Sequence, residues 1–304
     1  MTSESRFFDL YQDCTLCPRM CHVDRTAKTG FCGCTSELSA ARAALHFWEE
    51  PCITGNGGSG TVFFSGCTLK CCFCQNYPIS CEGLGKTVSV SRLAEIFLNL
   101  QKQGAENISL VTATQHLPSI LPALDMVKDS LHIPVVYNCG GYERTETLDL
   151  LNGYVDIYLP DLKYYNNETA WKYSRADNYF SYASTAVKKM VEQVGPPVLN
   201  EHGVMTKGVI IRHMILPGQK EDSIRLLQWM ADALPENSFY LSLMSQYTPF
   251  YHADRYPQIN RRITTYEYNK VLDKAILLGL TNGYMQEKSS AKEEYTPPFD
   301  FEGI

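Results

Sequence analysis

The sequence predicts an α/β fold in which helices cover a mainly parallel β-sheet. Six short apolar segments recur along the chain, and each is followed by a longer segment with the apolar spacing of a helix. The short segments are mostly unbroken by polar residues, which is typical of strands buried on both faces. The chain has 304 residues, 44% of them apolar, so it is long enough to bury such a core.

The six units can be placed in order. Strands are expected at residues 61–65, 108–112, 134–137, 155–159, 209–215 and 239–243. The helices that follow them are expected at residues 90–103, 117–130, 145–151, 182–193, 222–233 and 265–278. Residues 196–207 are expected to form a hairpin that turns at Glu201, His202 and Gly203. Periodicity leaves two closures open: an open doubly wound sheet, and a barrel that lacks two of its eight units.

Composition divides the chain into three regions. Residues 1–57 are rich in cysteine, residues 58–288 hold the strand–helix units, and residues 289–304 form a polar, proline-bearing tail. A glycine-rich stretch at residues 56–60 links the first region to the first strand.

Charge and hydropathy exclude two classes of partner. The net charge is −6 without a block of like charge, whereas a nucleic-acid partner requires a basic face. No run approaches the roughly 20 apolar residues that span a bilayer. The first thirteen residues contain Glu4 and Asp9 and lack the apolar core of a signal peptide. The sequence therefore predicts a cytoplasmic protein.

Twelve cysteines need an explanation in a reducing compartment. Ten of them form two clusters, one between residues 14 and 34 and one between residues 67 and 81. Clustered cysteines in such a compartment indicate metal ligation rather than disulfides.

The second cluster contains Cys67-x3-Cys71-x2-Cys74, directly after the first predicted strand. Thiolates suit iron–sulfur clusters and zinc. Zinc would require a fourth protein ligand, whereas a cubane held by three cysteines keeps one iron free for a substrate or cofactor. Cys72 adjoins Cys71 and is interpreted as a packing residue.

This spacing after a first strand resembles the signature of the radical S-adenosylmethionine (SAM) superfamily. The resemblance implies a [4Fe-4S] cluster on Cys67, Cys71 and Cys74, whose open iron binds the amino and carboxylate groups of SAM. It also implies that Phe73 lies near the adenine, and that an electron donor of the flavodoxin or ferredoxin type supplies the reducing electron.

Two further segments resemble the pyruvate formate-lyase activating enzyme and its relatives. Residues 155–163 end in an Asp-x-Lys pair, and residues 209–218 carry an arginine before a Pro-Gly turn. This likeness implies a partial (β/α)6 TIM-like barrel, and a glycyl radical enzyme as partner. The chain lacks the Gly-Gly-Glu motif that binds the SAM amino group, so the residues in its place, Thr112, Thr114 and Gln115, are expected to contact SAM instead.

Groups at the carboxyl ends of parallel strands face the active site of such folds. By this rule Asn138 and Asp161 are expected to contact the cofactor, and Gly140 to let the backbone approach it closely. We expect Lys163 and Arg212 to be catalytic, with Lys163 binding the SAM carboxylate or an anionic substrate. The alternative for Lys163 is an ion pair with Asp161 at the rim. The same rule places His116 and Gln246 at strand ends, and alternation turns His213 toward the helices.

The first cysteine cluster supplies a second candidate metal site. Cys14, Cys17, Cys21 and Cys32 form a four-thiol set, with Cys34 as a fifth thiol nearby. Such a set suits a structural zinc or a second iron–sulfur cluster, and the spacing does not choose between them.

The resemblance implies an enzyme that cleaves SAM reductively and uses the 5′-deoxyadenosyl radical to abstract a hydrogen atom. The substrate is either a glycyl radical enzyme or a small molecule or peptide. A non-catalytic iron–sulfur electron carrier is the alternative of another class, and it would require four cysteines at each cluster.

Overall fold

The computed structural model describes residues 7–286 and 296–304, which form one open sheet of ten strands. Its parallel part consists of β2 (Ser59–Phe64), β4 (Asn107–Val111), β5 (Val135–Cys139), β6 (Ile157–Pro160), β8 (Met205–Met214), β9 (Tyr240–Met244) and β10 (Gly283–Met285). At one edge, β1 (Ser39–His46) lies antiparallel to β2, and β3 (Lys86–Thr87) lies antiparallel to β1. The six predicted strands are all present, and the predicted partial (β/α)6 barrel is confirmed.

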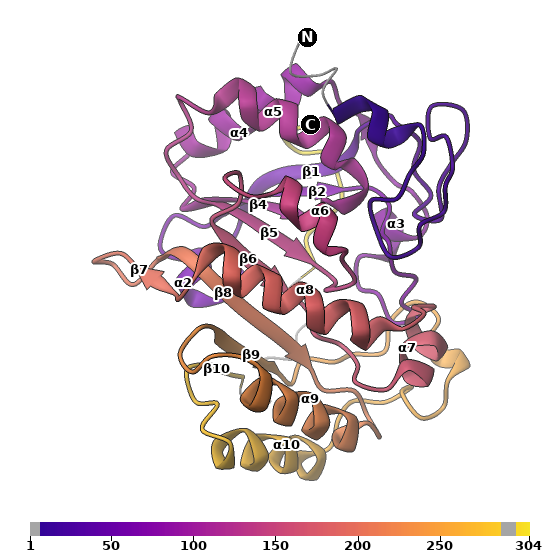
Figure 1. Cartoon of the computed structure of the whole chain (residues 1–304), viewed down its shortest axis with the longest axis vertical. Coiled ribbons are helices and arrows are strands. Elements are labelled where there is room, and N and C mark those ends of the chain that lie inside the picture. The colour runs from indigo at the N-terminus through magenta and orange to yellow at the C-terminus, as the bar shows by residue number, and fades with distance from the viewer. Residues whose placement is uncertain (1–6, 287–295) are drawn as a thin grey trace.

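The connecting helices follow one another in the order of the strands, from α4 and α5 near β2 and β4 to α9 and α10 near β9 and β10 (Figure 1). They are α4 (Val90–Lys102), α5 (Leu117–Val127), α6 (Thr145–Leu150), α8 (Tyr179–Val194), α9 (Lys220–Ala233) and α10 (Thr265–Leu277). The shorter helices are α2 (Pro51–Thr54), α3 (Tyr77–Ser80) and α7 (Asn167–Ser174), with 3-10 turns η1 (Asp9–Tyr11), η2 (Thr114–His116) and η3 (Ala253–Arg255).

Helix α4 illustrates how the sequence sets these elements. The side chain of Ser89 accepts a hydrogen bond from the backbone N–H of Arg92 and so caps the first turn. Buried apolar side chains at positions 93, 96, 97 and 100 then repeat at helical spacing, so one face packs against the sheet. The predicted hairpin is also present, because β7 (Val198–Leu199) pairs antiparallel with the start of β8.

Alternation along the strands separates two cores. Side chains such as Tyr158 and Ile211 belong to the large core that includes the helices. Side chains of opposite orientation, such as Ile157 and Ile210, pack instead against Cys52 and Ile53 of α2. Helix α2 therefore fills the concave side of the sheet at the amino-terminal ends of the strands, and leaves their carboxyl ends open.

The last described residues lie along β1. The backbone N–H of Phe301 donates to Ala41 O at 3.0 Å, and Ala43 N–H donates to Glu302 O at 2.8 Å. Part of the predicted tail, residues 289–295, lies outside the described residues. None of the described helices combines the length and the apolar character required to cross a bilayer.

Candidate active site

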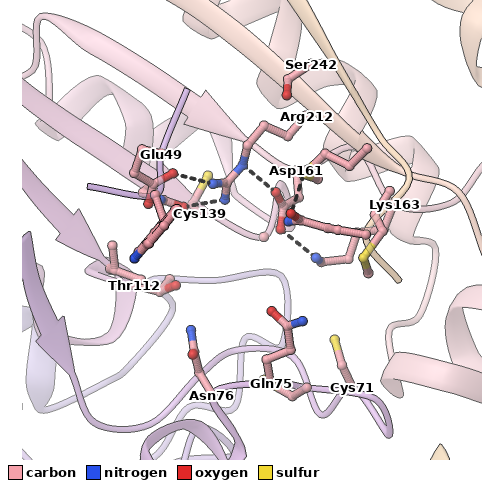
Figure 2. A pocket seen from close by; sticks show the side chains of 18 of the residues that line it. Glu49, Cys71, Gln75, Asn76, Thr112, Cys139, Asp161, Lys163, Arg212 and Ser242 are labelled. Carbon is pink, nitrogen blue, oxygen red and sulfur yellow. Dashed lines mark hydrogen bonds and ion pairs between the residues drawn. The ribbon is translucent and has the colours of Figure 1, made fainter. Parts of the chain in front are cut away.

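A cavity of about 560 Å³ opens at the carboxyl ends of the parallel strands. One wall is the loop after β2, which contributes Cys67, Cys71 and Cys74. The opposite side carries charged residues from the ends of β6 and β8 and from the segment between β1 and α2. Figure 2 shows Cys71, Gln75 and Asn76 across the cavity from Arg212, Asp161 and Lys163. The arrangement gives the cavity a thiol end and an ionic end.

The cysteine loop is held by backbone hydrogen bonds at several points. Gly66 adopts a positive φ of 78°, and its N–H donates to Ile79 O at 2.8 Å. The N–H of Lys70 donates to Ser174 O at 3.0 Å, and that of Cys72 donates to Tyr173 O at 2.8 Å. The loop is thus held by α3, which follows it directly, and by α7, which lies about 100 residues further along the chain.

Each of the three sulfur atoms has a polar neighbour. Cys67 Sγ accepts from the backbone N–H of Leu69 at 3.4 Å, and Cys71 Sγ accepts from the Ser174 hydroxyl at 3.0 Å. Cys74 Sγ and the Ser80 hydroxyl lie 3.2 Å apart. Donors of this kind favour a thiolate over a thiol, as metal ligation requires.

Arg212 is the centre of the ionic end. Its Nε donates to Asp161 Oδ1 at 2.8 Å, its Nη1 to Glu49 Oε2 at 3.0 Å and its Nη2 to Asn138 Oδ1 at 2.7 Å (Figure 2). Lys163 Nζ donates to the second oxygen of Asp161 at 2.6 Å. Lys163 therefore makes the expected ion pair with Asp161, and its role in binding SAM or an anionic substrate stays a prediction.

These pairs fix the charges of the ionic end. Burial alone would raise the pKa of Asp161, but Arg212 and Lys163 hold it below its ordinary value. Burial opposes the charge on Lys163, yet Asp161 raises the pKa of its ammonium. Both partners are therefore ionised at neutral pH.

Glu49 and Glu50 are the site residues that sequence reasoning missed. They follow β1 and directly precede α2, in the region assigned by composition to the cysteine-rich segment. Glu49 accepts from Arg212 although 163 residues separate them in the chain. The sequence does contain a signal, because two adjacent glutamates precede Pro51, a residue that favours the first turn of a helix.

Residues 61–230 of the chain match the radical SAM superfamily, which is more than half of its length. The chain belongs to the radical SAM superfamily.

An uncharacterized protein of Methanocaldococcus jannaschii is 32% identical over 277 residues, covering 88% of this chain and 75% of that protein. Among solved structures, methylornithine synthase (PylB) has a TM-score of 0.50 at 15% identity, covering 90% of this chain and 68% of its own. Streptococcus suis SuiB bound to S-adenosylmethionine has a TM-score of 0.49 at 14% identity, covering 73% of this chain and 48% of its own. The chain thus spans about half the length of SuiB, and these identities concern the fold alone.

The radical SAM fold implies a [4Fe-4S] cluster and SAM, and the cysteine loop fits such a cluster. Of the five cysteines between residues 67 and 81, those that line the cavity are Cys67, Cys71 and Cys74. Burial raises the pKa of Cys67 to about 12 and raises the pKa of Cys71 and Cys74 as well. A bound metal would supply the positive charge that holds such thiols as thiolates.

Most of the predicted cofactor contacts line the same cavity. They are Phe73, Thr112, Asn138, Gly140 and Asp161. Phe73 is buried and packs edge-on against Tyr247, with ring centroids 5.6 Å apart. The absence of a side chain at Gly140 lets Leu69 of the cysteine loop approach the backbone closely, because a Cβ atom at Gly140 would lie 2.7 Å from Leu69 Cδ1.

Two expected cofactor contacts, Thr114 and Gln115, do not line this cavity. The 3-10 turn η2 turns the Thr114 hydroxyl toward Glu143 Oε1, 2.9 Å away. Gln115 Nε2 donates to the carbonyls of Ser65 and Gly66 at 3.0 and 2.9 Å, and His116 Nε2 lies 3.0 Å from the same Ser65 carbonyl. Gln115 and His116 therefore support the start of the cysteine loop from behind.

Glu143 is a third buried acid that sequence reasoning did not identify. Its carboxylate accepts from Thr114 and from the Tyr137 hydroxyl, at 2.9 and 3.3 Å. Burial raises the pKa of Glu143 to about 8. His213 is buried and does not line the cavity, and its Nδ1 lies 2.6 Å from Leu162 O.

The N-terminal cysteines pack directly on the cysteine loop. Cys67 N–H donates to Cys32 O at 3.3 Å, and Arg25, which is fully buried, places Nη1 3.9 Å from Cys14 Sγ. Cys17 and Cys21 lie in the same segment and are half-buried. Across residues 7–286 and 296–304, no three His, Cys, Asp or Glu side chains gather closely enough to hold a single metal ion. A zinc or second cluster on Cys14, Cys17, Cys21 and Cys32 stays a prediction.

Proposed function

We propose that the protein is a SAM-cleaving enzyme whose [4Fe-4S] cluster is held by Cys67, Cys71 and Cys74. The observation that carries this proposal is the single cavity that joins three thiols at one end to an ionic network at the other. When bound, the reduced cluster and SAM together supply a 5′-deoxyadenosyl radical that abstracts a hydrogen atom from the substrate.

The residues of this chain would orient SAM and keep water out. Lys163 is close enough to Cys71 for the two to interact electrostatically, so it is the cation best placed to bind the SAM carboxylate. Asp161 holds Lys163, and Arg212 holds Asp161, so both charges are positioned before SAM arrives. Phe73 and Leu69 give the thiol end apolar walls, which shield a reactive intermediate.

The proposed substrate is a small molecule or a side chain that enters the cavity. Support comes from α2, which fills the opposite end of the concave side, so that the cavity is a pocket open at the carboxyl ends of the strands rather than a channel. The alternative substrate, a glycyl radical enzyme, is favoured by the Asp161-x-Lys163 pair and the Arg212 strand that resemble the activating enzymes. A flavodoxin or ferredoxin is the proposed electron donor, and cytoplasmic location stays a prediction.

Anaerobic reconstitution with iron and sulfide, followed by dithionite and SAM, tests the proposal. We expect 5′-deoxyadenosine and methionine in equal amounts from the wild type, and none above background from Cys71→Ala. Cys72→Ala is the matched control, since Cys72 does not line the cavity, and it is expected to retain cleavage. If the wild type yields no more 5′-deoxyadenosine than the background of Cys71→Ala, the proposed enzymatic activity is refuted and a simple electron carrier is favoured.

A further inference from the structure

Among the described residues, the ionic end of the cavity holds three acidic side chains and two basic ones. Among the described residues that line the cavity, the carboxylates are Glu49, Glu50 and Asp161, and the cations are Lys163 and Arg212. Both cations are engaged, Lys163 with Asp161 and Arg212 with Asp161 and Glu49. His46 also lines the cavity, but burial lowers its pKa to about 4, so it adds no charge at neutral pH.

Glu50 is the acidic side chain of this end that makes no ion pair within the described part of the chain, although the charge of Arg212 acts on it. It is 8% exposed, and within the described part of the chain its Oε2 atom has no hydrogen-bond partner. Its polar neighbour is the hydroxyl of Ser242, the middle residue of β9. A buried carboxylate with an unbonded oxygen is destabilised unless another group donates a hydrogen bond to that oxygen. Glu50 is the N-cap residue of α2, and it lines the cavity together with Pro51, which we call the floor of the cavity.

We propose that Glu50 and Ser242 bind the ammonium group of the substrate. This inference rests on the proposed function, and it names the class of molecule that the radical would attack, an alkyl amine. An ammonium group has three donors, which suit a carboxylate and a neighbouring hydroxyl. Burial raises the pKa of Glu50, and the positive charge of a bound ammonium would favour its ionised form.

The position of Glu50 separates this site from that of SAM. Ser242 lies beyond Arg212 on the side of the cavity away from Cys71 (Figure 2). SAM bound at the thiol end would therefore leave the floor beside Glu50 for a second molecule. An amine anchored there places its carbon chain between the floor and the cysteine loop, where hydrogen abstraction would occur.

The test measures binding of n-butylammonium to the reconstituted, SAM-loaded protein by saturation-transfer NMR, with n-butanol as the uncharged match. We expect the wild type to bind the ammonium at least tenfold more tightly than the alcohol. Glu50→Gln is expected to lose this preference, and Glu37→Gln, a change at an exposed glutamate, is expected to keep it. N-acetyl-lysine methylamide, measured in parallel, distinguishes a peptide side chain from a free amine.

Two results would overturn the inference. One is an ammonium preference that survives in Glu50→Gln or is absent from the wild type. The other is a loss of SAM affinity in Glu50→Gln as large as the loss of ammonium affinity, which would assign Glu50 to the amino group of SAM. Failure of the wild type to bind or cleave SAM would instead refute the proposed function, so the two failures are distinguishable.

Discussion

Arg212 joins three acceptors that come from three separate parts of the chain. Asp161 follows β6, Asn138 belongs to β5, and Glu49 precedes α2. Because guanidinium donors point in fixed directions, one side chain can satisfy all three where a lysine could not. Burial opposes the charge on Arg212, and the carboxylates of Asp161 and Glu49 raise its pKa in return.

Arg212→Met is expected to destabilise the fold by about 3–5 kcal/mol, because Asp161 and Glu49 would lose their shared counterion while still buried. The measurement is the free energy of unfolding in guanidinium chloride. Arg212→Met combined with Glu49→Gln should recover part of the loss, since one buried charge is then removed as well. An Arg212→Met variant as stable as the wild type would show that the network contributes nothing to folding.

Glu143 makes stability depend on pH in a predictable direction. Burial raises the pKa of Glu143 to about 8 from an ordinary value near 4.5. Between these values the folded protein retains the proton that the unfolded chain releases, so stability falls as the pH rises, by at most about 1.4 kcal/mol per pH unit.

Chemical denaturation of the wild type and Glu143→Gln at pH 5, 6, 7 and 8 checks this prediction. Since the amide cannot ionise, the stability of Glu143→Gln relative to the wild type should increase steadily across the series. A constant difference between the two proteins would mean that Glu143 is already ionised at pH 5.

At the scale of elements, the cysteine loop depends on a position that only glycine can occupy. Gly66 has a positive φ, and a Cβ atom there would lie 2.1 Å from Cys34 Sγ and 2.9 Å from Cys32 O. The N-terminal cysteine segment and the loop are therefore in contact where the loop leaves β2. Gln115 and His116 support the same turn through the Ser65 carbonyl.

After reconstitution, Gly66→Ala is expected to bind at most about half as much iron per protein as the wild type, because the loop must shift to relieve the clash. Gly83→Ala is the matched control. Gly83 also has a positive φ, of 73°, but a Cβ atom there would meet nothing within 4 Å. If the two variants bind equal amounts of iron, any loss of iron relative to the wild type comes from backbone strain and not from the contact with Cys34.

The elements were predictable wherever the information is local. The strand cores, the α4 cap and the hairpin before β8 all follow from residues adjacent in sequence. Strand β10 was not predicted, because it has only three residues, Gly283–Met285, and depends on pairing with β9. Thr114 has the sequence position of a strand-end ligand, yet a single 3-10 turn redirects its hydroxyl to Glu143.

At the scale of the whole molecule, the cavity is assembled from segments that no local pattern connects. The cysteine spacing predicts the thiol end, since its three members lie within eight residues. The ionic end requires Glu49 to meet Arg212 across 163 residues of sequence, which only the folded sheet brings about. The parts of the site predicted from sequence are therefore the cysteine loop and the ends of the predicted strands, whereas Glu49 and Glu50, which reach the site through tertiary contacts, were missed.

Superfamily membership supports the central claim, that a cluster held by three cysteines of one loop keeps one iron open toward the cavity. The most direct measurement is the electron paramagnetic resonance spectrum of the anaerobically reconstituted, dithionite-reduced protein before and after SAM is added. To isolate this loop, the N-terminal cysteines Cys14, Cys17, Cys21 and Cys32 are replaced by serine in a parallel sample. The account predicts a [4Fe-4S] signal whose g-values shift with SAM in both samples and which is lost in Cys71→Ala. A signal that SAM leaves unchanged, or one that persists without Cys71, would contradict it.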